Sequence, residues 1–211
     1  MSNYPAKFIT LEGSEGAGKS TAMATLTAQL KDWGVDFVQT REPGGETNAE
    51  QIRELLLHSD HLHARTELLL MFAARNEHII KVIRPALEQG TWVVSDRFVD
   101  ASYAYQGLGR GIAWETIEYL EQWIVGDIKP HLTLLLDVEP QTGLDRAAKR
   151  SKKDRIEQEE TPFFEQIRRG YLTRAKADPE RIKVVDANQS ESAVQQQIIN
   201  QLQQFKSRVE G

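Results

Sequence analysis

The feature that most constrains the fold of this chain is a complete G-x-x-x-x-G-K-[ST] phosphate-binding motif at residues 13–20. An apolar run, Phe8-Ile9-Thr10-Leu11, precedes the motif and predicts a buried strand. Apolar residues then recur at helical spacing between residues 23 and 33, and Gly34 marks where a helix would stop. A strand, a glycine loop and a helix in this order point backbone N–H groups at one anion. The sequence therefore predicts a site for a nucleoside triphosphate.

The residues of this loop have distinct expected roles. Lys19 would reach the β- and γ-phosphates, and the hydroxyl of Ser20 would ligate Mg²⁺. The residues expected to hold ATP are Gly13, Ser14, Glu15, Gly16, Ala17, Gly18, Lys19, Ser20 and Thr21. The alternative is a glycine-rich turn in front of a core helix, and the flanking strand and helix disfavour it.

Apolar runs and amphipathic segments alternate along the rest of the chain. Further strands are expected at residues 36–40, 92–96, 132–137 and 182–186. Their continuous apolar character indicates burial on both faces, as in a parallel sheet. We therefore predict a single α/β domain over residues 1–211, with a five-stranded, mainly parallel sheet of the P-loop NTPase type and helices on both faces.

Two helices carry local signals. Thr47 and Glu50 form a capping-box pattern at the start of one helix. A longer helix is expected over residues 66–89, with Pro85 as a kink or a restart. Residues 100–111 are rich in glycine and tyrosine, which predicts an ordered loop or a helix start that faces the site.

Composition narrows the class of protein. The 26 Lys and Arg residues are outnumbered by 31 Asp and Glu, and the formal charge of −5 argues against a nucleic acid polymer as partner. The chain has no cysteine, which excludes disulfides and thiolate metal sites. Its polar N-terminus resembles neither a signal nor a transit peptide, and no apolar stretch is long enough to span a membrane. We expect a cytoplasmic protein without membrane contact.

Charged residues follow the predicted strands, where ligands of open α/β sheets bind. Asp96 is placed to hold Mg²⁺ through water, and the adjacent Arg97 would complement a phosphate, although a strand-end acid is also a common turn residue. Arg41 and Arg53 are candidates for a second phosphate. For either arginine, an ordinary surface position is almost as good an interpretation.

The long helix contains a candidate base reader. Phe72 and Arg75 are three residues apart and share a face, so one could stack on a base while the other binds its edge. The competing interpretation places Phe72 in the apolar core stripe, and periodicity alone favours it.

A basic segment lies between residues 146 and 155. Such a run is commonly a solvated helix face. However, the phosphate loop contains the acid Glu15 and no base besides Lys19, and phosphoryl transfer requires additional cations. We therefore predict a mobile lid at about residues 146–160 that supplies arginine and excludes water.

Several motifs together resemble one known family. They are Glu12-Gly13-Ser14-Glu15-Gly16-Ala17-Gly18-Lys19-Ser20-Thr21, Arg41-Glu42-Pro43-Gly44-Gly45, Asp96-Arg97-Phe98, Tyr105-Gln106-Gly107 and Asp154-Arg155-Ile156-Glu157. In this order they are similar to bacterial thymidylate kinases, over almost the whole chain. The resemblance implies transfer of the ATP γ-phosphoryl group to dTMP, giving dTDP and ADP, with Mg²⁺, in a homodimer that serves dTTP synthesis.

The resemblance also implies site roles. Arg53 and Arg97 would bind the dTMP phosphate, with Glu42 and Asp96 near the transferring group. The thymine edge would be read by Arg75, Ser102 and Gln106, with Tyr105 packed where a 2′-OH would sit. Arg150 and Arg155 would be lid arginines, as in the branch without an arginine in the phosphate loop. Many members place the stacking phenylalanine at the position of Met71, so either Met71 or Phe72 covers the base.

Rival functions differ in their sequence requirements. The main alternative function is that of another nucleotide or deoxynucleoside kinase. Adenylate kinases, however, usually have glycine after the loop lysine, where this chain has Ser20. A GTPase needs an Asn-Lys-x-Asp guanine reader, which the chain lacks. A non-catalytic ATP-binding module would leave the acceptor-side motifs unexplained.

Overall fold

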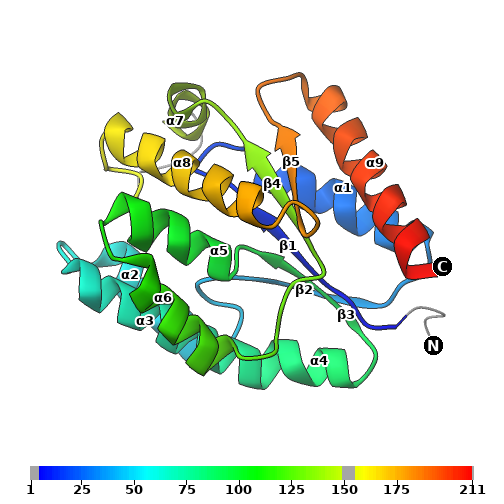
Figure 1. The fold of residues 1–211 in the computed structure, drawn as a ribbon, viewed down its shortest axis with the longest axis horizontal. Helices are drawn as coiled ribbons and strands as arrows, with labels where there is room; N and C mark the ends of the chain where they lie inside the picture. Colours follow the sequence, from blue (N-terminus) through cyan, green and yellow to red (C-terminus); the bar gives the residue numbers. More distant parts are fainter. Residues whose placement is uncertain (1–4, 149–154, 211) are drawn as a thin grey trace.

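A parallel five-stranded sheet forms the centre of the molecule, with the strand order β2-β3-β1-β4-β5. The structure, a computed structural model, describes residues 5–148 and 155–210. The strands are β1 (Phe8–Glu12), β2 (Phe37–Arg41), β3 (Trp92–Asp96), β4 (Leu132–Asp137) and β5 (Ile182–Asp186). All five predicted strands are present, and the predicted α/β class with a parallel sheet is confirmed (Figure 1).

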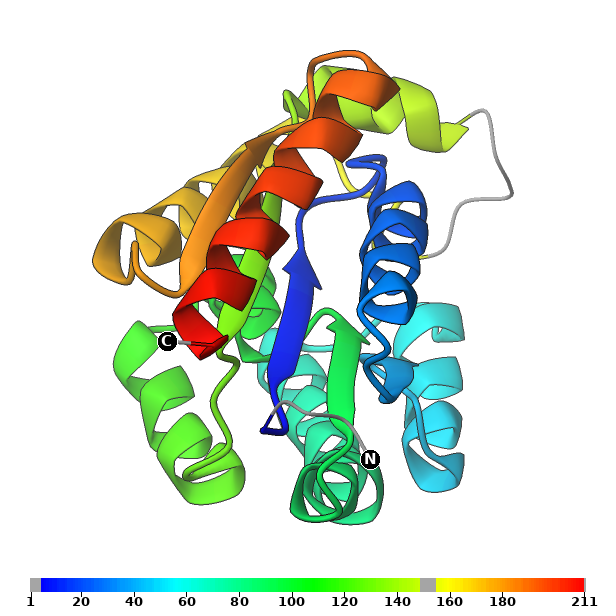
Figure 2. The same ribbon diagram turned by 90° about the vertical axis from the view of Figure 1, so that its right-hand side faces the viewer.

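Helices cover both faces of the sheet (Figures 1 and 2). On one face, α1 (Lys19–Asp32) and α9 (Glu191–Glu210) pack on Ile9 and Leu11 of β1. On the other face, Phe8 and Val93 contact a cluster built largely from the long helix after residue 64 and from α6 (Trp114–Leu120). Alternate β1 residues thus face opposite layers, as the pleat of a strand requires. Helix α8 (Thr161–Ala177) and the segment after β3 complete the second face beside β4.

The long helix is interrupted once. It comprises α3 (Ala64–His78), a π-helical turn η1 (Ile79–Ile83) and α4 (Arg84–Glu88), with Pro85 in the first turn of α4. Proline lacks the N–H that an interior helical position donates, so a restart at Pro85 satisfies the backbone. The predicted restart is therefore confirmed, and the wider π turn just before it has no simple sequence signal.

The predicted cap of α2 (Thr47–His58) is wrong in detail. Glu46, not Thr47, is the N-cap, and its carboxylate accepts the N–H groups of Asn48 and Ala49. Glu50 does not close a capping box, because its carboxylate accepts Gly45 N–H and pairs with Arg41 at 2.9 Å. The Glu50 carboxylate that a capping box would require is thus engaged in contacts outside the helix.

The remaining elements position the site. After β3 come α5 (Val99–Ser102) and a π-helical segment η2 (Tyr103–Gly109), so residues predicted as a loop or helix start are helical. A third π-helical element, η3 (Glu121–Val125), follows α6, and α7 (Pro140–Ala148) leads into the predicted lid. Among the described residues, no helix is long and apolar enough to cross a membrane.

Candidate active site

A cavity of about 270 Å³ opens at the carboxyl end of the sheet, beside the loop that joins β1 to α1. Its wall contains residues 15–20, the ends of β2 and β3, and side chains from α2, α3 and η2. Because β1 lies between β3 and β4, the strand order reverses there, and open α/β sheets bind ligands at such a position.

The loop has the backbone of an anion-binding site. Gly13, Gly16 and Gly18 have φ angles of 144°, 68° and 90°, which residues other than glycine rarely adopt. Gly18 is the N-cap of α1, so the positive end of that helix faces the cavity. Lys19 Nζ lies 3.3 Å from Gly13 O and 3.4 Å from Ser14 O, at the long end of hydrogen-bond range. Burial, and then Arg97, lower the pKa of this ammonium.

Helix α7 packs against the same loop through two glycines. A Cβ on Gly16 would lie 1.8 Å from Gly143 O, and a Cβ on Gly143 would lie 2.5 Å from Glu15 O. Neither distance is compatible with a side chain. The predicted ATP loop and the helix leading into the predicted lid are therefore in direct backbone contact.

Arg97 crosses the floor of the cavity. Its guanidinium donates to Gly13 O at 2.8 Å and to the Glu15 carboxylate at 2.5 Å, and it lies 4.9 Å from the centre of the Tyr105 ring. Burial opposes the ionisation of Glu15, but Arg97 and Lys19 outweigh it and hold the pKa of the carboxyl below its usual value.

The backbone of Arg97 is strained. Its φ of 70° is unusual for a residue with a side chain. Hydrogen bonds hold the conformation, because Arg97 N donates to Leu11 O at 2.8 Å and the Ser95 hydroxyl donates to Arg97 O at 2.7 Å. Such strain persists where surrounding contacts fix it, and it is concentrated at functional sites.

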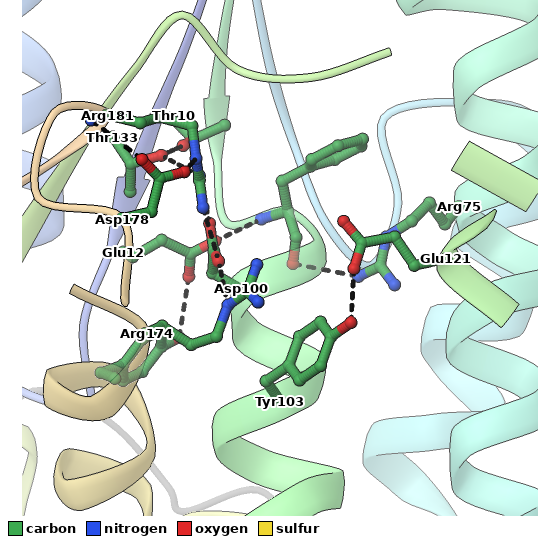
Figure 3. Close-up of polar contacts among 12 residues, drawn as sticks. Thr10, Glu12, Arg75, Asp100, Tyr103, Glu121, Thr133, Arg174, Asp178 and Arg181 are labelled. Carbon is green, nitrogen blue, oxygen red and sulfur yellow. Dashed lines mark hydrogen bonds and ion pairs between the residues drawn. The ribbon is translucent and has the colours of Figure 1, made fainter. Parts of the chain in front are cut away.

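Glu12 lies behind Arg97 and is fully buried. It accepts the N–H of Phe98 at 2.8 Å and the hydroxyl of Tyr171, from α8, also at 2.8 Å. Burial, reinforced by the carboxylate of Asp100, raises the pKa of Glu12 to about 8. Asp100 is itself held between Arg174 and Arg181, at 2.8 and 2.6 Å (Figure 3).

Asp96 and Ser20, the predicted Mg²⁺ residues, both line the cavity. Asp96 Oδ1 is buried and has no hydrogen-bond partner within residues 5–148 and 155–210. A buried carboxylate oxygen without a donor suits a hydrated cation. The described part of the chain contains no cluster of three acidic or histidine ligands. Mg²⁺ that is bound mainly through phosphates and water does not need one.

The predicted base readers lie partly in the cavity wall and partly behind it. Met71 lines the cavity, whereas Phe72 belongs to the core cluster beneath it. Arg75 is 1% exposed, and its guanidinium donates to Glu42, Ser102 and the carbonyl of Phe98 at 2.7, 3.0 and 3.0 Å. Neither Arg75 nor Ser102 belongs to the cavity wall, and Glu42 does.

Glu42 is the buried centre of that arrangement. Its second oxygen lies 3.0 Å from His78 Nδ1. Burial opposes its ionisation, but Arg75 and His78 outweigh that effect and lower the pKa of the carboxyl. Glu42 therefore fixes Arg75 in place from the cavity side.

Gln106 and Tyr105 project from η2 into the cavity wall. Gln106 Nε2 donates to Glu67 of α3 at 2.9 Å, and the Tyr105 hydroxyl donates to Glu15 at 3.2 Å. Tyr105 thus joins the predicted sugar position to the phosphate loop.

The predicted phosphate and lid arginines have different surroundings. Arg53 and Arg41 both line the cavity. Arg53 donates to Pro43 O at 2.8 Å, and Arg41, which is more than half exposed, pairs with Glu50. Arg155 does not line the cavity, since its guanidinium binds Leu56 O and Glu67, each at 2.9 Å. Arg150 lies outside the described residues.

Comparison with known proteins identifies the family. A family model described as thymidylate kinase matches residues 11–198. The chain belongs to the thymidylate kinase family. It is 52% identical to a thymidylate kinase of Methylococcus capsulatus, over 94% of this chain and 95% of that protein. It is 56% identical to one of Pseudomonas syringae pv. tomato, over 89% and 90% of the two chains.

A solved structure agrees with this assignment. The crystal structure of the thymidylate kinase from Ehrlichia chaffeensis has a TM-score of 0.78 and 31% identity, with 93% of this chain and 98% of that chain covered. The predicted P-loop NTPase fold is confirmed. The chain is an ATP-dependent kinase that phosphorylates dTMP to dTDP, as its motifs predict.

Sequence reasoning missed several residues of the thymidylate kinase site. Glu67 is a charged residue four positions before Met71 and eight before Arg75, so helical spacing places it on their face. That spacing could have revealed it. Tyr171 carries no comparable signal, because it is 159 residues from its partner Glu12.

Proposed function

We propose that phosphoryl transfer from ATP to dTMP takes place in this cavity, with Mg²⁺ as cofactor. The observation that carries the proposal is the shared cavity wall, which combines Lys19 and Arg97 with Met71 and Gln106. The charged residues suit two phosphate groups, and the partly apolar remainder suits a base.

Residues 13–21 would bind the phosphates of ATP through backbone N–H groups, with Lys19 turning its ammonium from two carbonyls toward the transferring group. Ser20 and Asp96 would hold Mg²⁺, which neutralises phosphate charge when bound. Arg97 and Arg53 would fix the dTMP phosphate in line with the γ-phosphate. Glu15 pairs with Arg97 and offsets part of its charge, so a further cation is needed to stabilise the transferring phosphoryl group. We assign that role to Arg150 and Arg155 of the lid.

The acceptor end would recognise thymine and deoxyribose. Met71 lines the cavity and is the better candidate to cover the base, with Phe72 supporting Arg75 from below at 4.8 Å. Gln106 would read the thymine edge from the cavity wall, with Arg75 and Ser102 in support behind it. Glu42 would act on this end as well, because it anchors Arg75. Tyr105 would occupy the space of a 2′-OH.

The proposal includes a homodimer and a cytoplasmic location. Large apolar side chains are exposed on the connected elements α3, η1, α6 and η3, namely Leu69, Ile80, Tyr119 and Trp123, at 60, 54, 67 and 72%. Exposed apolar groups of this size are typical of an interface, and a second copy of the chain would cover them. A chain without cysteine is compatible with the reducing cytoplasm.

The experiment that tests this function is ADP release with each nucleoside monophosphate in turn. We expect dTMP to be the preferred acceptor, dUMP to be weaker, and UMP to be far weaker than dUMP because Tyr105 crowds the 2′-OH. Equal kcat/KM for dUMP and UMP would show that Tyr105 does not read the sugar. A preference for another base would overturn the assignment of the acceptor end.

A further inference from the structure

One acceptor atom in the cavity wall has no partner. Gln106 is 2% exposed, and its Oε1 is buried without a hydrogen bond among the residues that the structure describes. A buried amide oxygen in this state keeps an uncompensated desolvation cost unless a ligand donates to it. Gln106 lies in the wall of the cavity, so a ligand that fills the cavity is placed to supply the missing donor.

The orientation of this amide is fixed by Glu67. The carboxylate of Glu67 is 1% exposed and lies 2.9 Å from Gln106 Nε2. An ionised carboxylate only accepts hydrogen bonds, so the NH₂ end of the amide must face it. The reverse orientation would bring two oxygens together and leave the NH₂ group directed away. The side-chain chemistry therefore determines which end of Gln106 faces a ligand.

Two arginines pair with the carboxylate of Glu67. Arg155 Nη2 donates to Glu67 Oε2 at 2.9 Å, and Arg110 Nε lies 3.3 Å from the same oxygen. The other oxygen, Oε1, is the one that accepts from Gln106. If lid movement withdrew Arg155, Arg110 would still pair with Glu67, so the orientation of the amide does not depend on the lid.

We propose that Glu67 is a specificity-determining positioning residue, which turns Gln106 so that its Oε1 accepts a ring N–H of the substrate base. The inference rests on the proposed function of the cavity as the nucleotide acceptor site. A thymine or uracil ring carries an N–H at N3, whereas cytosine has an acceptor there. The fixed amide therefore favours the first class and opposes the second, because an acceptor facing an acceptor leaves both unpaired.

The substitution Glu67→Gln makes a directional test. Arg110 and Arg155 need an acceptor, so the new amide would turn its oxygen to them and its NH₂ group to Gln106. Gln106 would then reverse, and an NH₂ group would face the base. We expect kcat/KM for dTMP to fall at least about tenfold and the dTMP to dCMP ratio of kcat/KM to fall by a similar factor or more.

Two further variants separate positioning from general damage. Glu159→Gln removes another carboxylate partner of Arg110, at 2.5 Å, without touching Gln106, and it should keep the dTMP to dCMP ratio. In a Gln106→Ala background, Glu67→Gln should no longer change that ratio, because the amide through which it acts is gone. If Glu67→Gln folds poorly, N3-methyl-dTMP tests the wild-type enzyme instead, and its binding should be weakened at least about tenfold relative to dTMP.

The outcomes distinguish this inference from the function on which it rests. A wild-type chain that does not phosphorylate dTMP would contradict the proposed function itself. A wild-type chain that does so, with an unchanged ratio in Glu67→Gln, would overturn the role of Glu67. An equal change in Glu159→Gln, or an effect of Glu67→Gln that survives in the Gln106→Ala background, would also overturn it, as would N3-methyl-dTMP bound as tightly as dTMP.

Discussion

The contact between α7 and the phosphate loop predicts that Gly143→Ala destabilises the protein, although helix propensity alone predicts the opposite. Gly143 lies within a helix, where alanine is favoured over glycine by about 1 kcal/mol. In the structure, however, a Cβ at this position would lie 2.5 Å from Glu15 O and 3.2 Å from Val138 Cγ1. The first atom is backbone and cannot rotate away. Helix propensity and packing therefore make opposite predictions for Gly143→Ala.

Packing is expected to dominate. Overfilling a close-packed site costs roughly 1–3 kcal/mol, and the backbone obstacle at Glu15 O places Gly143→Ala in the upper part of that range, at about 2–3 kcal/mol. Subtracting the helix gain of about 1 kcal/mol leaves a net loss of about 1–2 kcal/mol. For a domain of this size we expect a Tm lower by roughly 2–8 °C. The displaced peptide joins Glu15 to Gly16 in the loop proposed to bind ATP, so KM for ATP should rise while KM for dTMP changes little.

Thermal unfolding and steady-state kinetics measure both effects. Thr142→Ala is the matched control, because it raises helix propensity in the same turn of α7 and leaves the glycine contact intact. We expect its Tm to be equal to or above that of the wild type. A Gly143→Ala variant with a raised Tm and an unchanged KM for ATP would refute the reasoning.

Two further predictions concern buried charge and the lid. The pKa of Glu12 is raised from 4.5 to about 8, so the folded chain binds more protons than the unfolded chain between these values, and stability falls as pH rises through that window. Between pH 5.5 and 8.5, the free energy of unfolding in denaturant should decline less for Glu12→Gln than for the wild type, by on the order of a few kcal/mol. An equal decline in the two proteins would refute this account of Glu12. Arg155→Ala should lower the single-turnover rate on the order of a hundredfold, with little change in ATP affinity. A normal chemical rate with weakened dTMP binding would show that Arg155 acts only as a partner of Glu67.

The fold was largely predictable because its signals are local. Each strand is a continuous apolar run, and each is found within one residue of its predicted bounds. The errors arise where a distant contact changes a local choice. Glu50 matches a capping box in sequence, but Gly45 and Arg41 engage its carboxylate, so Glu46 caps α2 instead.

The site was predictable where residues lie in motifs. Lys19, Asp96 and Gln106 were all expected near the bound nucleotides, and all three line one cavity. Partners that act through them were not predicted, since helical spacing places Glu67 on the face of Met71 but does not indicate which distant residues Glu67 contacts. Glu67 accepts hydrogen bonds from Gln106 and Arg155, which are 39 and 88 residues away in the sequence. The family resemblance left open whether Met71 or Phe72 covers the base, whereas periodicity favoured a core position for Phe72, which is where the structure has it.

In the proposed function, Lys19 and the phosphate loop position the γ-phosphoryl group of ATP for direct transfer to dTMP in the described cavity. This claim is tested most directly by following the label of γ-³²P-ATP into nucleotide products, in the wild type and in Lys19→Ala. Within the described part of the chain, the hydrogen bonds of the Lys19 ammonium go to carbonyls of the loop, so the variant should keep the Tm of the wild type within a few degrees. We predict that the wild type transfers the label to dTDP and that Lys19→Ala shows almost no transfer. A folded Lys19→Ala variant with near wild-type transfer to dTDP would contradict the claim.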